Sequence, residues 1–288
     1  MAITNSIPRL IINADDFGLS EGINRGIMEA VAAGVVRSTS IMVNMPAFTD
    51  AVRRAAAARN ELGVGLHFTL TAGRPLTRAP SLVVPETGEF LSLPGLINRA
   101  LSRRVEPREV ANECSAQVAR AREAGLDLTH LDAHHHVHVL PGIRDAVRRV
   151  VHADRIPAIR RPRERLFGIP VSRRRLAERL LMRTLATGMR PDHWHVCMTS
   201  HFVGSALLGA SDFEARLVKV LDWLPKGTTE LMVHPGYVPA PLPGADPYTT
   251  QREIELRALT SKRVRERLRS GLVELIHFGH LPNGTAPV

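Results

Sequence analysis

The sequence contains few cysteines, few aromatic residues and almost no lysine. Of its 288 residues, two are cysteines, 4% are aromatic, and only three of the 38 basic residues are lysines. Cys114 and Cys197 lie far apart in no CxxC or Cys/His motif, so neither a disulfide framework nor a cysteine zinc site is indicated. No apolar run approaches the roughly 18 residues of a membrane span, and residues 1–9 lack a signal-peptide pattern. We therefore expect a cytoplasmic protein.

The net charge of +10 is concentrated in one part of the chain. Residues 144–190 contain 14 arginines and four acidic residues, whereas bases and acids balance in the remaining sequence. Such a segment is able to attract an acidic substrate, a membrane surface or nucleic acid. Because it lacks interleaved aromatic residues and its arginines fall on mixed helix faces, we favour a solvated helical surface and expect no nucleic-acid partner.

Short apolar runs alternate with longer amphipathic stretches, which predicts an α/β fold with a parallel sheet. Strands are expected at 9–14, 38–44, 63–70, 128–132, 158–161, 193–198, 230–234 and 273–278. Helices are expected at 21–33, 47–59, 107–123, 141–151, 173–185, 211–221 and 250–269. Residues 71–94 and 237–247 are rich in proline and glycine and predict long loops. Seven or eight strands favour a single domain over residues 1–288, folded as a distorted (β/α) TIM-like barrel.

A pair of carboxylates directly follows the first predicted strand. Asp15 and Asp16 come after an apolar run and precede a turn that leads into a helix. Two adjacent carboxylates repel each other unless a cation or a proton offsets the repulsion, although one of them is equally suited to cap the helix. Adjacent residues of an extended segment point to opposite faces, so one carboxylate is placed to hold a metal and the other to act as a base.

Five of the 13 histidines lie within nine residues, together with Asp132: they are His130, His134, His135, His136 and His138. Imidazoles at this density, beside a carboxylate, are typical of divalent metal sites, with an oligohistidine surface as the alternative. In an extended or turn conformation, His134, His136 and His138 share one side. At most two of the five are therefore expected to be ligands, with the others around the metal or on the substrate.

Two further histidines end predicted apolar strands. His67, taken alone, is more often a core residue than a ligand, but the metal-type residues at other strand ends favour a ligand. His234 precedes a Pro-Gly turn and is a candidate proton donor. Because the carboxyl ends of parallel strands meet at one edge of the sheet, all these side chains are expected to converge.

In this order the residues resemble the YdjC-like carbohydrate deacetylases, which include the chitooligosaccharide deacetylases. The matching blocks are NADDFGLS (13–20), INRGI (23–27), STS and MVN (38–44), VGLHFTLTAGRPL (64–76), THLDAHHHVHVLPGI (129–143), MVHPGY (232–237) and YTTQREIE (248–255). The resemblance covers nearly the whole chain. The sequence departs from the family at Ala133, where a serine is common in the chitooligosaccharide branch, and residues 156–189 contain no recognised motif.

The resemblance implies a barrel that holds one divalent ion, magnesium or zinc, on an Asp-His-His triad. Carried onto this sequence, Asp16, His67 and His134 become the metal ligands and Asp15 the general base. The implied reaction removes the N-acetyl group from a small chitooligosaccharide or related glycoconjugate. An N-acetylglucosaminyl lipid is an alternative substrate, and we add His234 as the acid that protonates the leaving amine.

Other assignments and functions stay open from the sequence. Arg74, on the loop after His67, and Tyr237 are candidate substrate-binding residues, and a homodimer is left open. Aspartate and histidine at strand ends also serve other metal-dependent barrel enzymes, such as phosphoesterases and sugar isomerases. A nucleic-acid or membrane-surface binding protein with a vestigial site is a third class, which rests on the arginine-rich segment.

Overall fold

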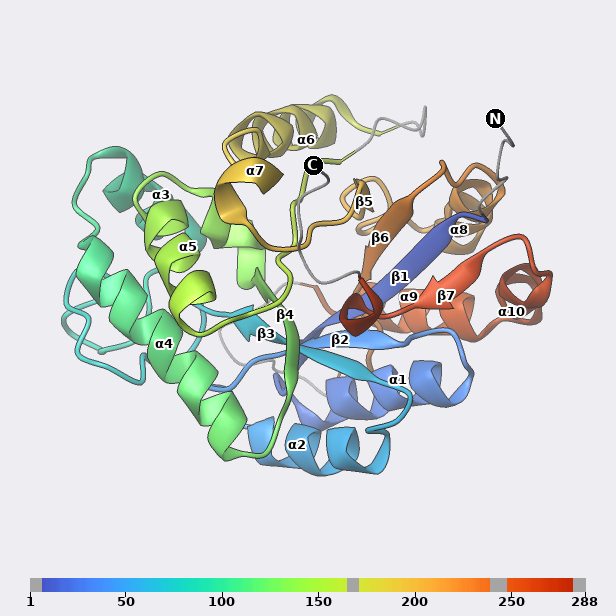
Figure 1. Ribbon diagram of the computed structural model, residues 1–288, viewed down its shortest axis with the longest axis horizontal. Helices are drawn as coiled ribbons and strands as arrows, with labels where there is room; N and C mark the ends of the chain where they lie inside the picture. The colour runs from blue at the N-terminus through green and yellow to red at the C-terminus, as the bar shows by residue number, and fades with distance from the viewer. Residues whose placement is uncertain (1–6, 165–170, 239–247, 282–288) are drawn as a thin grey trace.

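The computed structural model shows an α/β fold built on a parallel sheet (Figure 1), and it describes residues 7–164, 171–238 and 248–281. The strands are β1 (Arg9–Phe17), β2 (Ser38–Ile41), β3 (Gly63–Phe68), β4 (Leu128–Ala133), β5 (His201–Val203), β6 (Thr228–Val233) and β7 (Glu274–Ile276). Their order in the sheet is β4-β3-β2-β1-β6-β5, and β7 pairs with the first residues of β1. The expected α/β class is confirmed.

Helices surround the sheet, with α1 and α2 below it, α4 and α5 on one side and α8 to α10 on the other in Figure 1. The helices are α1 (Glu21–Ala32), α2 (Phe48–Ala57), α3 (Leu93–Leu101), α4 (Pro107–Glu123), α5 (Ile143–Ala153), α6 (Arg173–Ala186), α7 (Pro191–Trp194), α8 (Phe213–Asp222), α9 (Thr250–Thr260) and α10 (Lys262–Arg269). Among the described helices, none combines the length and apolarity needed to cross a membrane.

The sheet is curved into a half-barrel that is consistent with the expected distorted barrel. Between its edge strands β4 and β5, residues 158–164 form isolated parallel bridges: Ile159 with Leu131 of β4, Ala158 with Cys197, and Glu164 with Phe202 of β5. A regular TIM-like barrel, in which each strand pairs continuously with two neighbours, is not established by single bridges of this kind.

The sequence prediction was wrong in four segments. The strand predicted at 158–161 is not formed, because Ala158 and Ile159 make isolated bridges instead of a continuous ladder. Residues 193–198 do not form a strand, because Pro191 starts the short helix α7 and the next strand begins at His201. The predicted loop 71–94 ends in α3, whose first turn is capped by the Ser92 side chain and contains Pro94. The single helix predicted over 250–269 is broken at Ser261, which is extended and caps α10. Residues 239–247 of the second predicted loop lie outside the described residues.

Strand β1 runs through the centre of the core and carries the first polar residues of the site at its end. Leu10, Ile11 and Ile12 have no exposed surface, as expected for a parallel strand covered on both faces. The apolar run stops at Asn13, and Asp15 and Asp16, both also buried, come just before the last residue of the strand, Phe17. Buried charges require partners, which here come from the neighbouring strand end at His67, from Arg160 and from Arg252.

The glycine pair Gly26 and Gly236 allows α1 to pack against the turn that follows β6. A Cβ atom at Gly26 would lie 2.6 Å from the Gly236 Cα, which is backbone and has little room to move. We expect Gly26→Ala to lower the free energy of unfolding by about 1–3 kcal/mol, measured by urea denaturation, despite alanine's higher helix propensity.

The matched control is Gly95→Ala in α3, where the nearest atom to the added Cβ, Ser92 Oγ, lies at an ordinary 3.4 Å. This variant should be as stable as the wild type or slightly more stable. Equal effects of the two substitutions would contradict the close approach of α1 and the β6 turn.

Candidate active site

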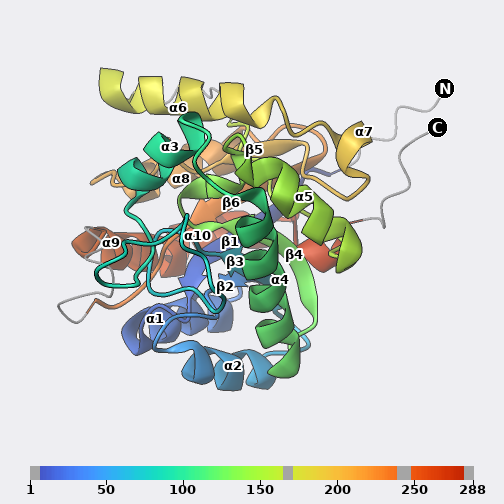
Figure 2. The same ribbon diagram turned by 90° about the vertical axis from the view of Figure 1, so that its left-hand side faces the viewer.

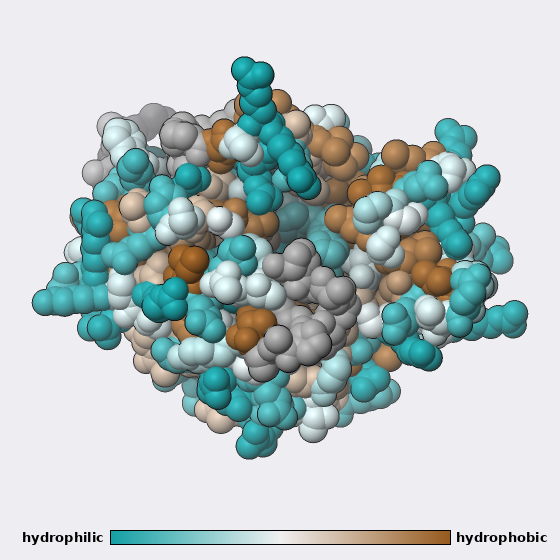
Figure 3. All heavy atoms as spheres, turned by 180° about the vertical axis from the view of Figure 1, so that it is seen from behind, coloured by the Kyte–Doolittle hydropathy of each residue, from teal (hydrophilic) through white to brown (hydrophobic). Residues whose placement is uncertain are grey.

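The residues singled out at the strand ends meet in one cavity of about 340 Å³. Asp15 and Asp16 from β1, His67 from β3, His134 after β4 and His234 after β6 all line it. Arg175, Glu178 and Met182 of α6 also line the cavity. The face seen from behind in Figure 3 is hollowed near its centre, and the visible floor of the hollow is hydrophilic. The convergence predicted from the strand-end positions is therefore present.

A bulge at the end of β1 turns both carboxylates toward the cavity. The pairing of β1 with β2 shifts register between Ala14 and Phe17, and Asp16 has a left-handed backbone with φ of 68°. An aspartate in this region is uncommon and conformationally strained, and such residues cluster at functional sites. The expectation that Asp15 and Asp16 point to opposite faces is wrong, because the bulge breaks the alternation of an extended strand.

Asp16, His67 and His134 form a compact donor cluster. Asp16 Oδ1 lies 3.3 Å from His67 Nε2 and 3.1 Å from His134 Nδ1, and all three side chains are buried. One ligand atom from each residue lies within 4.8 Å of the others. One carboxylate and two imidazoles are donors that zinc and other divalent ions accept. The residues present therefore fit a divalent ion.

Asp132 fixes the orientation of His67. Its Oδ1 accepts a hydrogen bond from His67 Nδ1 at 2.7 Å, which leaves Nε2 directed at Asp16. Burial lowers the pKa of His67, but the charge of Asp132 and hydrogen bonds to Asp132 and Asp16 outweigh it and raise the pKa to about 10. The site thus attracts positive charge, and a carboxylate behind a ligand histidine is the common arrangement in metal centres.

Arg252 of α9 binds the second carboxylate oxygen of Asp16, Oδ2. Its guanidinium donates to Asp16 Oδ2 at 2.6 Å and to the Tyr248 carbonyl at 2.8 Å. Burial alone would raise the pKa of Asp16, but Arg252 and the two imidazoles hold it well below its ordinary value. Asp16 is consequently ionised and directs Oδ1 to the histidines. Arg252 belongs to the YTTQREIE block, but no role was predicted for it from the sequence.

Arg160 forms ion pairs with three further carboxylates of the site. It is completely buried and contacts Asp15 at 2.6 and 2.7 Å, Asp132 at 2.8 Å and Glu230 at 2.6 Å. Two hydrogen bonds to Asp15 form the bidentate pair for which a guanidinium is suited. The interpretation of the arginine-rich segment as a solvated surface is therefore wrong for Arg160, and also for Arg179, which is buried against Glu164.

Comparisons with known proteins assign this chain to a family. The family described as YdjC-like protein matches residues 9–270. This chain belongs to that family. A protein named carbohydrate deacetylase from Brevibacillus brevis is 35% identical, and the match covers 95% of this chain and 99% of the relative. Another of the same name, from Geobacillus stearothermophilus, is 36% identical over 93% of this chain and 96% of its own. A crystal structure from Enterococcus faecalis, named for cellobiose-phosphate cleavage, is 25% identical with a TM-score of 0.74, covering 95% of this chain and 98% of its own.

The histidine run of this YdjC-like chain does not present alternate residues to one side. It forms a 3-10 helical segment, His134–Val139, in which His135 and His136 adopt left-handed backbones with φ of 54° and 55°. His134, His135 and His136 consequently line the cavity together, while His138 is buried and contacts the Arg160 carbonyl at 3.0 Å. The predicted grouping of His134, His136 and His138 is wrong, because consecutive left-handed residues reverse the chain direction.

His234 lies at the cavity wall with its backbone anchored by Glu255. Its backbone N–H donates to Glu255 Oε2 at 2.6 Å, and the other oxygen of Glu255 accepts from the Tyr248 hydroxyl. The His234 ring meets the Tyr248 ring edge-on at 5.4 Å between centroids. Among the described residues, His234 Nδ1 has no hydrogen-bond partner although it is buried. Glu255 thus holds the backbone of His234 in place, and Tyr248 packs against its imidazole.

Arg74 and Tyr237 are not among the residues that line the cavity. Arg74 is exposed on the loop after β3. The Tyr237 hydroxyl donates to Glu29 of α1 at 2.6 Å, and the Arg25 guanidinium lies 4.5 Å from the centre of its ring. Their roles as substrate-binding residues remain predictions. Tyr248, the first residue of the YTTQREIE block, does line the cavity.

Glu230 gives the site a pH-dependent contribution to stability. Burial raises its pKa to about 7 from an ordinary value of 4.5, despite the opposing charge of Arg160. Between these values the unfolded chain has released the proton and the folded chain retains it, so stability falls as pH rises. The unfolding free energy of Glu230→Gln minus that of the wild type should therefore rise by about 3 kcal/mol between pH 4.5 and 7. Both proteins are measured with a chelator present.

The control for this measurement is Glu123→Gln, at an exposed position at the end of α4. Its unfolding free energy should differ from that of the wild type by the same amount at every pH. A difference curve for Glu230→Gln that is equally flat would show that this carboxyl is ionised in the folded state at low pH.

Proposed function

We propose that this chain is a metal-dependent hydrolase that removes the N-acetyl group from an acetylated amino sugar, a small chitooligosaccharide or related glycoconjugate. The observation that carries the proposal is the Asp16–His67–His134 cluster, which shares one cavity with a second carboxylate, Asp15. The names of the bacterial relatives, carbohydrate deacetylases at about one-third identity over nearly their full length, support the same reaction and the same class of substrate.

Asp16, His67 and His134 would hold the divalent ion, with magnesium and zinc as the favoured metals. When bound, a divalent ion supplies a Lewis acid that polarises the acetamide carbonyl and lowers the pKa of water. Asp132 and Arg252 act on this triad by orienting it, since Asp132 fixes the His67 ring and Arg252 reserves Asp16 Oδ1 for the imidazole side.

Asp15 is proposed as the general base that takes a proton from the attacking water. Arg160 holds both carboxylate oxygens, and Asn13 adds a hydrogen bond to Oδ1 at 2.8 Å. Among the described hydrogen bonds, Oδ2 has Arg160 as its single partner, so it keeps acceptor capacity toward the cavity. The carboxylate is thus fixed in direction before the substrate arrives, which is the geometric requirement for proton transfer.

His234 is proposed as the acid that protonates the leaving amine. It lies on the β6 side of the cavity, whereas His67 and His134 approach from β3 and β4. An amine leaving group needs a proton because its anion is too basic to depart. Tyr248 packs against the His234 ring, and the Arg252 guanidinium lies 5.5 Å from the centre of the Tyr248 ring, so this aromatic side chain is held beside the proposed acid.

Acetate release from a panel of N-acetylated sugars and glycolipids, with chelated and metal-restored protein, tests this function. Asp15→Asn should lower turnover by about 10²-fold or more while metal content stays near that of the wild type. His67→Ala should lose metal and activity together, because it removes a ligand. Both quantities are measured on the same samples, metal by elemental analysis and acetate by an enzyme-coupled assay.

Two results would overturn the assignment in different ways. If no acetate appears from any substrate although metal is bound, the deacetylase reaction is wrong, and phosphate release from phosphorylated sugars becomes the next assay. If Asp15→Asn and His67→Ala lose metal equally, the division between base and ligand is wrong.

The acid is tested separately with His234→Gln and two kinds of acetyl substrate. Hydrolysis of an N-acetyl sugar should fall by about 10²–10⁴-fold, whereas hydrolysis of 4-nitrophenyl acetate should change little because its leaving group departs without a proton. His195→Gln, an exposed histidine that does not line the cavity, is the control. Equal losses on both substrates would show that His234 acts before the leaving-group step.

A further inference from the structure

Helix α6 carries its leucines outward and an arginine inward. Leu176, Leu180 and Leu181 are 40%, 45% and 61% exposed. Arg179, by contrast, is 3% exposed and pairs with Glu164 at 2.9 Å. An amphipathic helix of a water-exposed domain normally has the opposite arrangement, with leucines in the core and arginine in solvent. Three neighbouring exposed leucines on one helix therefore indicate a surface that is covered when the protein functions.

The direction of each side chain follows from helix geometry. With about 100° per residue, Leu176, Leu180 and Leu181 fall on one broad face, and Arg173 and Arg174 lie at the N-terminal end of that same face. Arg179 and Ala186 lie on the opposite face, where both are buried. The outward face is therefore a compact apolar strip with two arginines at one end.

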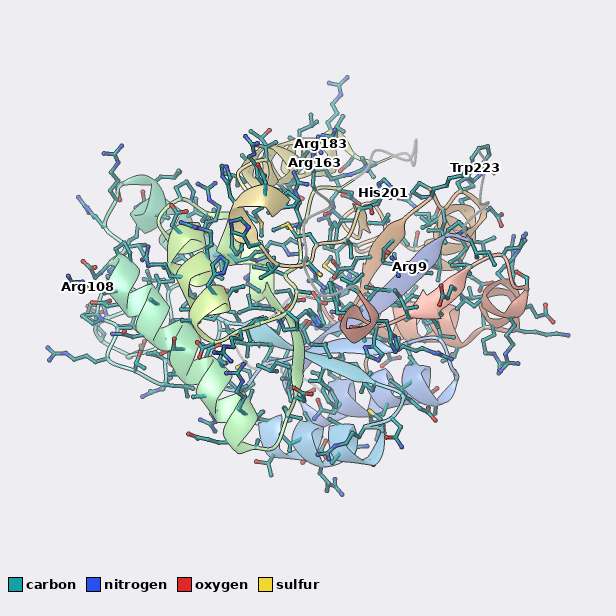
Figure 4. All side chains as sticks on the ribbon, in the orientation of Figure 1. Arg9, Arg108, Arg163, Arg183, His201 and Trp223 are labelled. Atoms are coloured by element: carbon teal, nitrogen blue, oxygen red, sulfur yellow. The ribbon has the colours of Figure 1, made fainter. Side chains whose placement is uncertain are left out.

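The charges around this strip are predominantly positive. The segment 144–190 contains the whole excess of positive charge in the sequence. Glu178 is the acidic residue of α6, and it already pairs with Arg174 at 3.0 Å and Arg175 at 3.1 Å. In Figure 2 the helix lies along the top edge of the molecule, and Figure 4 labels Arg183 of α6 there, well away from Trp223.

We propose that the outward face of α6 docks onto an anionic lipid membrane. Leucines that enter the boundary between headgroups and acyl chains, beside arginines that contact anionic headgroups, are the elements of an interfacial helix. This docking does not depend on the deacetylase reaction. It also differs from the expectation of a solvated helical surface, since solvation explains the arginines but not the leucines.

Other occupants fit the face less well. In a two-fold dimer the same patch meets itself, so the arginines of α6 would need acidic partners that this helix does not supply beyond Glu178. Nucleic acid offers phosphates to the arginines but nothing apolar to the leucines, and exposed aromatic side chains for base stacking are absent from α6. An anionic bilayer matches both the charge and the apolar strip.

The position of the face connects membrane docking with the cavity. Arg175, Glu178 and Met182 of α6 line the cavity, while Leu176, Leu180 and Leu181 lie on the same turns of the helix and face solvent. A bilayer against α6 would therefore lie beside the cavity wall. A sugar whose lipid anchor stays in the bilayer would need to extend only a short distance to enter, an arrangement that rests on the proposed function in addition to the docking itself.

Vesicle co-sedimentation with the full chain tests the docking. The wild type should bind vesicles of phosphatidylglycerol and phosphatidylcholine, and should bind pure phosphatidylcholine much more weakly. The double variant Leu180→Ser with Leu181→Ser should bind at least about tenfold more weakly, because two leucines that would be partly buried in the bilayer are lost. Arg173→Gln with Arg174→Gln should weaken binding several-fold at low salt and less at high salt.

The matched controls are exposed apolar residues elsewhere, Leu272→Ser at 70% and Trp223→Ser at 77% exposure. Both should bind vesicles as the wild type does, and circular dichroism checks that every variant is folded. The proposal is overturned if the wild type does not bind anionic vesicles, or if the controls lose binding as much as the leucine variant. It is also overturned if the leucine variant keeps vesicle binding and instead dissociates a dimer. Acetate release from a soluble substrate is measured in parallel, so a failure of docking and a failure of the reaction are distinguishable.

Discussion

The buried Arg160 guanidinium is the interaction on which the rest of the site depends. It connects Asp15 near the end of β1, Asp132 near the end of β4 and Glu230 within β6, so three strands of the sheet share one buried cation. Without this cation, three carboxylates would lie together in a region from which water is excluded, at a cost of several kcal/mol each. The same contacts determine the direction of Asp15 and, through Asp132, the ring orientation of His67. The positions of the proposed base and of one proposed ligand therefore follow from a single buried cation.

Strained backbone at two strand ends complements this electrostatic centre. Asp16 and the pair His135 and His136 adopt left-handed conformations that a regular strand or turn would avoid. Each of these residues lines the cavity, so the strain has a structural result: it brings adjacent residues to one side of the chain. Packing stabilises the strained turns, as the close approach of Gly26 to Gly236 does for the turn after His234.

The sequence was sufficient to predict the parts of the molecule that depend on periodicity. Buried strands such as Arg9–Phe17 appear as apolar runs, and their ends are marked by Asp16, His67 and His234 because parallel strands place functional groups there. Side-chain direction at irregular backbone was not predictable, since no pattern marks the bulge at Asp16 or the left-handed pair His135 and His136. Arg160 was missed because a cluster of arginines is usually solvated, and only the tertiary fold distinguishes the buried member from its exposed neighbours.

The charge balance of the site favours a cation there. Asp15, Asp16, Asp132 and Glu230 are buried with two guanidinium groups, Arg160 and Arg252. Even if Glu230 keeps its proton, as its raised pKa indicates up to about pH 7, the remaining carboxylates exceed the arginines by one. The raised pKa of His67 shows that a proton on the imidazole is able to supply the missing charge. A divalent cation at the triad would displace that proton and leave the site with an excess of positive charge, which is the property that the polarisation of an amide carbonyl requires.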